Sequence, residues 1–127
     1  MSTKSYRPET RLVHAGMLVT RDERDVREWR EGMARLASYP NVVVKLTGQG
    51  TFIHEVDPDF IAFVAEETLG WFGADRAMFG TNFPVEKLWT TMPPLVDAWR
   101  AAVADLPRAD QHAIFAGTAR RVYGLPE

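Results

Sequence analysis

The feature that most limits what this chain can fold into is the run Asn41-Val-Val-Val-Lys-Leu46, which lies between Tyr39-Pro40 and Gly48. Three β-branched residues in succession favour an extended strand over a helix. Because apolar side chains then point to both faces of the strand, both faces must be covered, as in a parallel sheet packed against helices. The run therefore predicts a central strand of an α/β protein.

Segments with strand and helix character alternate on both sides of this run. Arg11 to Ala15 is a short apolar segment that predicts a strand, and Thr20 to Glu23 matches the Ser/Thr-x-x-Glu capping box of a helix start. Apolar residues recur at helical spacing from there to Tyr39-Pro40. The further expected elements are a helix capped by Asp57-Pro58, a strand at 76–82, a helix that begins after Thr91, and a last helix at 110–123.

This order of elements predicts parallel βαβ units with right-handed crossovers. Three parallel strands leave two unpaired edges, and a complete (β/α)₈ barrel takes about 250 residues. The chain has 127 residues. We therefore expect a flexible lead-in at residues 1–10, followed at residues 11–127 by one α/β unit that is part of a (β/α)₈ TIM barrel.

Composition excludes several classes of function. The chain has no cysteine, which excludes disulfides, zinc–thiolate sites and thiol catalysis. A net charge of −2 with interspersed signs gives no electrostatic case for binding nucleic acid or an anionic membrane. No apolar run approaches the roughly 20 residues that span a bilayer, and residues 1–10 lack the apolar stretch of a signal peptide. We expect a cytoplasmic protein.

Four polar residues fall at the carboxyl ends of the expected strands, where parallel α/β proteins bind their ligands: His14, Lys45, Thr47 and Asn82. Each has a structural alternative, since the histidine could be hydrogen-bonded in the core, the threonine an ordinary strand residue and the asparagine a turn residue. Lys45 interrupts an apolar run, and burial of an unpaired ammonium group costs free energy. Their similar placement at successive strand ends favours one shared site.

Four segments in order are similar to the amidohydrolase-related family, which comprises predicted metal-dependent hydrolases with a TIM-barrel fold, lactone hydrolases among them. The segments are Val13-His-Ala-Gly16, Pro40-Asn-Val-Val-Val-Lys-Leu-Thr-Gly48, Asp75-Arg-Ala-Met-Phe-Gly-Thr-Asn-Phe-Pro-Val85 and Ile114-Phe-Ala-Gly-Thr-Ala-Arg-Arg-Val-Tyr-Gly124. Their order and spacing resemble the last three barrel strands and the closing helices. The resemblance implies that the chain is the C-terminal part of such a barrel, with the first strands missing.

The resemblance also implies roles for the candidate residues. His14 matches a histidine that binds a metal or polarises the substrate carbonyl, and Lys45 and Thr47 match a substrate-binding Lys-x-Ser/Thr pair at the mouth of the barrel. Asn82 lies where most relatives carry an aspartate that binds the metal or acts as general base. An amide has no proton-accepting carboxylate, so Asn82 cannot be that base. The family's His-x-His pair occurs nowhere in this sequence.

The function implied is hydrolysis of a lactone, ester or amide bond of a small molecule. The family implies zinc or manganese, but we expect this chain alone to bind no metal and to be inactive, as a truncated chain that works with a complementing barrel half or as a homo-oligomer. The alternative is a non-catalytic half-barrel that self-associates or binds a partner. The coding sequence upstream of Met1 would distinguish the two.

Overall fold

The computed structural model describes residues 10–15, 22–47, 55–81, 83, 87 and 90–126. Within them, three strands form one parallel sheet in the order β1-β2-β3, with β1 at Arg11–His14, β2 at Val42–Leu46 and β3 at Ala77–Phe79. The prediction of parallel βαβ units is confirmed. Residues 1–9 of the expected lead-in and the expected helix cap Thr20 lie outside the described residues.

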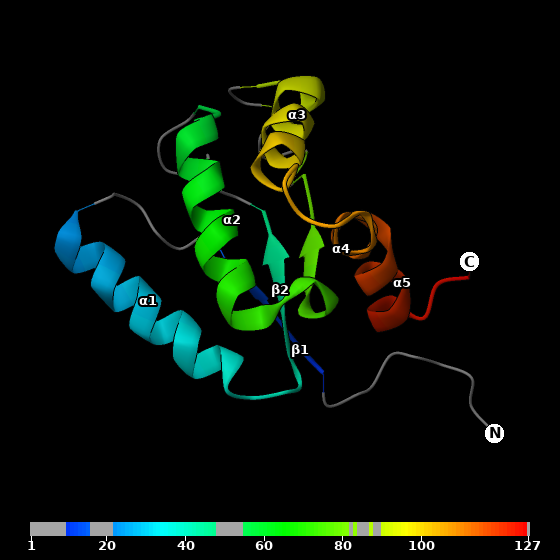
Figure 1. Ribbon diagram of the computed structural model, residues 1–127, viewed down its shortest axis with the longest axis horizontal. Helices are drawn as coiled ribbons and strands as arrows, with labels where there is room; N and C mark the ends of the chain where they lie inside the picture. The colour runs from blue at the N-terminus through cyan, green and yellow to red at the C-terminus, as the bar shows by residue number, and fades with distance from the viewer. Residues whose placement is uncertain are drawn as a thin grey trace.

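A helix follows each strand: α1 (Glu23–Ala37) after β1, α2 (Pro58–Phe72) after β2 and α3 (Met92–Ala102) after β3. Figure 1 shows α2 in front of the strands and α1 to the left of α2, and α2 contacts both α1 and α3. A last helical stretch combines α4 (Arg108–His112), the π-helical segment η3 (Ala113–Gly117) and α5 (Thr118–Tyr123). In the part of the chain that is described, no helix is both long and apolar enough to cross a membrane.

The sheet has two unlike faces. Val44 pairs in register with Val13 and Ala77, and the next residue, Lys45, pairs with His14 and Met78. Paired residues of parallel strands share a face, and successive residues alternate between faces. We call the face that carries Val44 the outer face, because it packs against helices α1, α2 and α3, and we call the opposite face the inner face.

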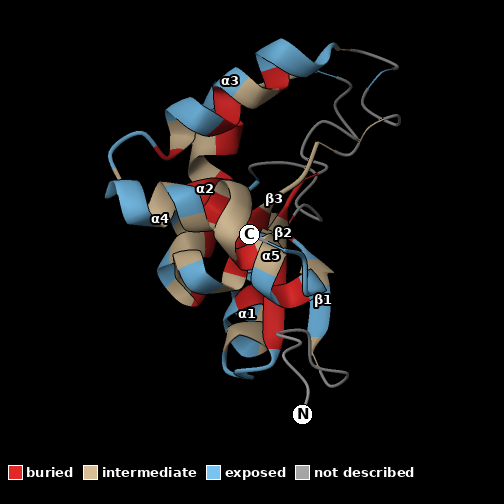
Figure 2. Cartoon of the chain, turned by 90° about the vertical axis from the view of Figure 1, so that its right-hand side faces the viewer, coloured by how far each residue is buried: buried red, intermediate tan, exposed pale blue. Residues whose placement is uncertain are grey.

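The main hydrophobic core lies between the outer face and the helices. Figure 2 shows the buried residues gathered between the two layers, whereas β1, at the edge of the sheet, is largely exposed. Trp29 of α1 fixes the helix layer to this edge, because its indole Nε1 donates a hydrogen bond of 2.9 Å to the Ala15 carbonyl oxygen. Its ring also packs edge-on against Trp71 at 5.5 Å between centroids. Both tryptophans thus pack in the main hydrophobic core.

The N-terminal caps of α2 and α1 differ in how well the sequence predicted them. Asp57 caps α2 as expected, since its carboxylate accepts from the Phe60 amide at 3.1 Å and Pro58 takes the first turn. For α1, the expected cap at Thr20 is wrong. The helix begins at Glu23 and its cap is Asp22, whose carboxylate accepts from the Arg24 amide at 2.9 Å. A carboxylate next to the positive end of the helix dipole explains this start.

The end of the chain differs from the expected elements in two respects. The third strand occupies Ala77–Phe79, which is shorter than the expected 76–82, and Arg76 belongs instead to a 3₁₀ turn, η1 (Ala74–Arg76), before it. The last helix starts at Arg108 and contains η3. Buried Ile114, Thr118 and Val122 are spaced by four residues, a spacing that drifts by about 40° per step in an α-helix. The wider π turn offsets this drift and keeps all three side chains inward.

Arg76 joins the helix layer to the sheet. Its guanidinium group donates to the carbonyl oxygens of Ala37 and Tyr39 at 3.0 Å each and of Val42 at 3.3 Å. It also lies 5.1 Å from the centroid of the Phe72 ring. One side chain thus binds carbonyl groups at the end of α1 and at the entry to β2, where the Tyr39 carbonyl oxygen also accepts from the Val42 amide at 3.1 Å.

We predict that Arg76→Met lowers the free energy of unfolding by about 2 kcal/mol, because several carbonyl groups lose a charged donor. Arg76→Lys should recover only part of the loss, since an ammonium group lacks the planar fork that reaches separate carbonyls. Urea unfolding followed by circular dichroism measures both. Arg27→Met, at an exposed position of α1, is the matched control and should change stability by less than about 0.5 kcal/mol. Equal losses in the two Met variants would contradict the assigned role.

Candidate active site

The candidate site lies on the inner face, at the carboxyl ends of β1 and β2. His14 is the last residue of β1, and Lys45 is the next-to-last residue of β2. The two are paired in the parallel register, so the sheet brings them side by side on one face. The outer-face neighbours of Lys45 along its own strand, Val44 and Leu46, are fully buried. The strand therefore holds Lys45 on a rigid part of the fold.

His14 and Lys45 differ in their surroundings. His14 is exposed on the edge strand, whereas Lys45 is half-buried. The Nζ atom of Lys45 lies 5.9 Å from the centroid of the Tyr123 ring, which comes from α5. Sequence reasoning missed Tyr123, because it marked only the end of the last helix. No local signal could have found it, since the contact joins a strand to a helix that is distant in the sequence.

Thr47 follows β2 on the same face and is only 2% exposed. Its side chain packs against Gly80, where an added Cβ would lie 3.4 Å from the Thr47 Cβ. The Gly80 amide donates to the Leu46 carbonyl oxygen at 3.2 Å, which holds the end of β3 against the end of β2. Thr47 thus has a packed place beside β3, and its expected contact with a substrate stays a prediction.

Asn82, the fourth candidate, lies outside the described residues. Near it in the sequence, the Thr81 hydroxyl oxygen accepts from the Phe83 amide at 3.3 Å. The structure thus brings His14, Lys45 and Thr47 to one face of the sheet and leaves the placement of Asn82 as a prediction.

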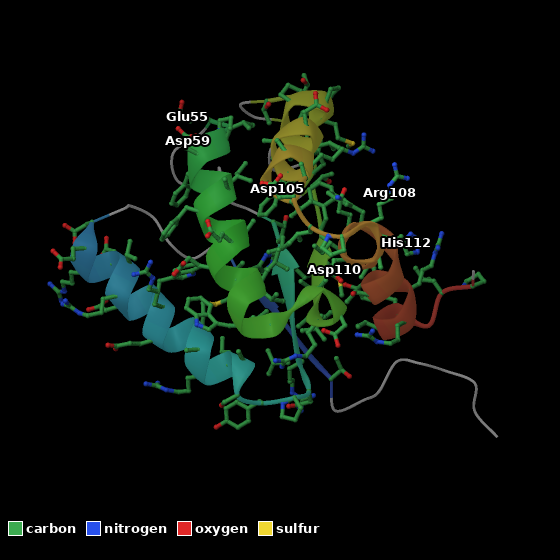
Figure 3. All side chains as sticks on the ribbon, in the orientation of Figure 1. Glu55, Asp59, Asp105, Arg108, Asp110 and His112 are labelled. Atoms are coloured by element: carbon green, nitrogen blue, oxygen red, sulfur yellow. The ribbon has the colours of Figure 1, made fainter. Side chains whose placement is uncertain are left out.

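Several other ionisable side chains belong to elements outside the strands that carry this site. Figure 3 labels Glu55 and Asp59 near the start of α2, and Asp105, Arg108, Asp110 and His112 around the connection from α3 to α4. His112 is exposed. An open hollow of about 560 Å³ lies beside α1 and is lined in part by Arg27, Arg30 and Phe63. Neither His14 nor Lys45 lines it, so it is separate from the candidate site.

The described residues do not fit a divalent metal. They contain no group of three or more His, Asp or Glu side chains placed to hold one ion. Metal sites in proteins normally use three or more protein ligands. His14 is paired with Lys45, and Lys45 is paired in turn with Met78. The strand residues beside His14 therefore offer a cation and a thioether. We therefore derive no chemical step through a metal.

Comparison with known proteins finds relatives over nearly the whole chain. The family model described as amidohydrolase matches residues 10–125. An L-fucono-1,5-lactonase of Burkholderia multivorans is 34% identical over 116 residues, which are 84% of this chain and 38% of the lactonase. An uncharacterized protein of Sinorhizobium fredii is 31% identical over 118 residues, 91% of this chain and 39% of that protein.

Solved structures agree with the sequence comparison. A crystal structure of an amidohydrolase from Burkholderia multivorans with bound zinc matches with a TM-score of 0.83 at 29% identity, over 92% of this chain and 45% of that one. An amidohydrolase from Bifidobacterium longum subsp. infantis, at 24% identity and a TM-score of 0.63, supports the fold alone. This chain spans less than half the length of each of these relatives. The expected fold, part of a TIM barrel, is confirmed.

We predict that the purified 127-residue chain retains much less than one zinc ion per chain after zinc loading and dialysis, because His14 has too few partner ligands. Elemental analysis by mass spectrometry measures the ratio. One zinc ion per chain that is lost in His14→Ala and kept in the control His112→Ala would overturn this prediction.

Proposed function

The chain belongs to the amidohydrolase family, and we propose that it supplies part of the active site of a hydrolase that cleaves a lactone, ester or amide bond of a small molecule. The observation that carries the proposal is the pairing of His14 with Lys45 on the inner face, at the carboxyl ends of two parallel strands. This is the end at which TIM-barrel enzymes carry their catalytic residues. The lactonase relative supports a cyclic ester as the substrate class.

In the proposed reaction, the oxygen of a water molecule adds to the substrate carbonyl carbon, and the bond from that carbon to the leaving oxygen or nitrogen then breaks. Lys45 donates a hydrogen bond to the carbonyl oxygen as it gains negative charge. His14 takes a proton from the attacking water and returns one to the leaving group. Thr47 lies on the same face as Lys45 and completes the proposed binding side of the site.

Asn82 has a narrower role in this proposal. Its amide can orient a water molecule or a substrate by hydrogen bonding, but it cannot remove a proton. Most members of the family that the sequence resembles carry an aspartate there. The departure leaves His14 as the proton acceptor among the candidate residues.

A chimera tests the proposed function. We predict that the Burkholderia multivorans lactonase, with its matching segment replaced by residues 10–125 of this chain, hydrolyses L-fucono-1,5-lactone. His14→Ala and Lys45→Met should each lower kcat/KM by about 100-fold or more, because each removes a group that acts on the transition state. His112→Ala and Lys87→Met, at exposed positions, are the matched controls and should leave turnover unchanged.

A folded chimera without turnover would favour the alternative, a non-catalytic module that works through its inner face. The observation behind this alternative is the poor cover of β1, where Leu12 is 37% exposed and His14 is exposed too. Self-association or a partner with further strands would cover such a face.

A second prediction concerns Asn82. In an active chimera, Asn82→Asp should raise lactone hydrolysis roughly tenfold or more, because a carboxylate can share the removal of the proton with His14. In the isolated chain the same change should produce no measurable turnover. A lactone-opening assay followed by pH indicator measures both. Unchanged turnover in a folded chimera that carries Asn82→Asp would show that this chain does not use a general base at this position.

A further inference from the structure

The C-terminal helix lies on the inner face of the sheet, beside the candidate site. Val122 of α5 is 4% exposed and forms a small buried cluster with Val43 of β2 and Met78 of β3. Both strand residues belong to the inner face, because Val43 alternates with Val44 and Met78 is paired with Lys45. Sequence reasoning had treated this helix only as a closing element. Its actual position brings it against the strands that carry the site.

Hydrogen bonds fix α5 in this position. The buried Thr118 hydroxyl donates to the Ala74 carbonyl oxygen at 2.8 Å, and the Arg121 guanidinium group donates to the Asp75 carbonyl oxygen. Both acceptors belong to η1, the turn that leads into β3. At the other end, Gly124 adopts a left-handed conformation with φ of 67°, which ends the helix directly after Tyr123. The helix end is therefore tied to the sheet and turns away from it at a defined residue.

This anchoring places the Tyr123 ring next to Lys45. Val122 points into the buried cluster, and the next residue, about 100° further around the helix, carries a ring whose centroid is 5.9 Å from the Lys45 Nζ atom. An ammonium group within about 6 Å of an aromatic ring is attracted by the ring's quadrupole. No carboxylate among the described residues forms an ion pair with Lys45. The ring is thus the electrostatic partner that the described residues provide.

We propose that Tyr123 is a positioning residue for Lys45: its ring holds the ammonium group on the inner face, where an anionic or carbonyl oxygen of a substrate would bind. The substrate part of this inference rests on the proposed function, whereas the contact between ring and ammonium group does not. An ammonium group needs such guidance, because the lysine side chain is flexible and its charge is strongly hydrated. A ring leaves the N–H donors free for the substrate, whereas a carboxylate would compete for them.

Nuclear magnetic resonance of the full chain, labelled with ¹³C at lysine, tests the contact. The lysines are Lys4, Lys45 and Lys87, so Lys45→Arg identifies the signal of Lys45. A ring over the ammonium group shifts the neighbouring Hε protons upfield. We expect Tyr123→Leu to return the Lys45 signal to the position of an exposed lysine, Tyr123→Phe to keep the shift, and the control Tyr39→Leu to leave it unchanged. A Lys45 signal that is the same in the natural chain and in Tyr123→Leu overturns the proposal.

Two further arms keep the test decisive. If Tyr123→Leu does not fold, Tyr123→Trp replaces it, and the larger ring should move the Lys45 signal further upfield, while an unmoved signal overturns the proposal. In an active chimera, Tyr123→Leu should lower kcat/KM roughly five- to tenfold, and Tyr123→Phe should keep kcat/KM at the value of the unsubstituted chimera. An unchanged kcat/KM in Tyr123→Leu contradicts the positioning role. An inactive chimera would refute the proposed function but leave the spectroscopic result intact, so the two failures can be distinguished.

Discussion

The alternation of side chains along β2 is the constraint on which the rest of the structure depends. Val42, Val44 and Leu46 point to the outer face and are at most 5% exposed, because α1, α2 and α3 cover them. The same backbone must then point Val43 and Lys45 to the inner face. Shifting β2 by one residue would put an ammonium group into the hydrophobic core and valines into the candidate site, and the cost of burying that charge excludes this register. The register of β2 therefore fixes both the packing of the core and the placement of the site.

The strand order and the faces could be predicted from the sequence, since they follow from local patterns. The β-branched run gave a buried strand, and Asp57-Pro58 gave the start of α2, because capping acts within one helical turn. The exact ends were harder. The competing caps Thr20 and Asp22 lie two residues apart, and Arg76, which was expected to begin a strand, instead binds carbonyl groups of α1 and β2. Such long-range contacts leave no periodic trace in the sequence.

The same distinction separates the two halves of the candidate site. His14 and Lys45 are paired because they lie at the carboxyl ends of two neighbouring strands. The sequence pattern predicts both strand ends, so both residues could be named in advance. Tyr123 could not, because its place depends on the π-helical turn that sets the phase of α5 and on the bonds that tie Thr118 and Arg121 to η1. The resemblance to a family suggested roles for His14 and Lys45 but none for Tyr123. The structure was needed to find a residue whose relation to the site is spatial.

Exposure to solvent limits the strength of the electrostatic interactions that His14 and Lys45 can make with a substrate. His14 is exposed at the edge of the sheet, and electrostatic interactions weaken as the surrounding dielectric approaches that of water. A hydrogen bond from Lys45 to a developing oxyanion gains its catalytic value from a site that excludes water. α5 supplies such cover on the β3 side through Val122, whereas the described residues leave Leu12 and His14 on the β1 side open. Full catalytic strength of His14 and Lys45 therefore requires further cover over β1. A strand or partner that pairs with this edge would raise the rate of the reaction by lowering the dielectric around His14, in addition to any effect of its own side chains.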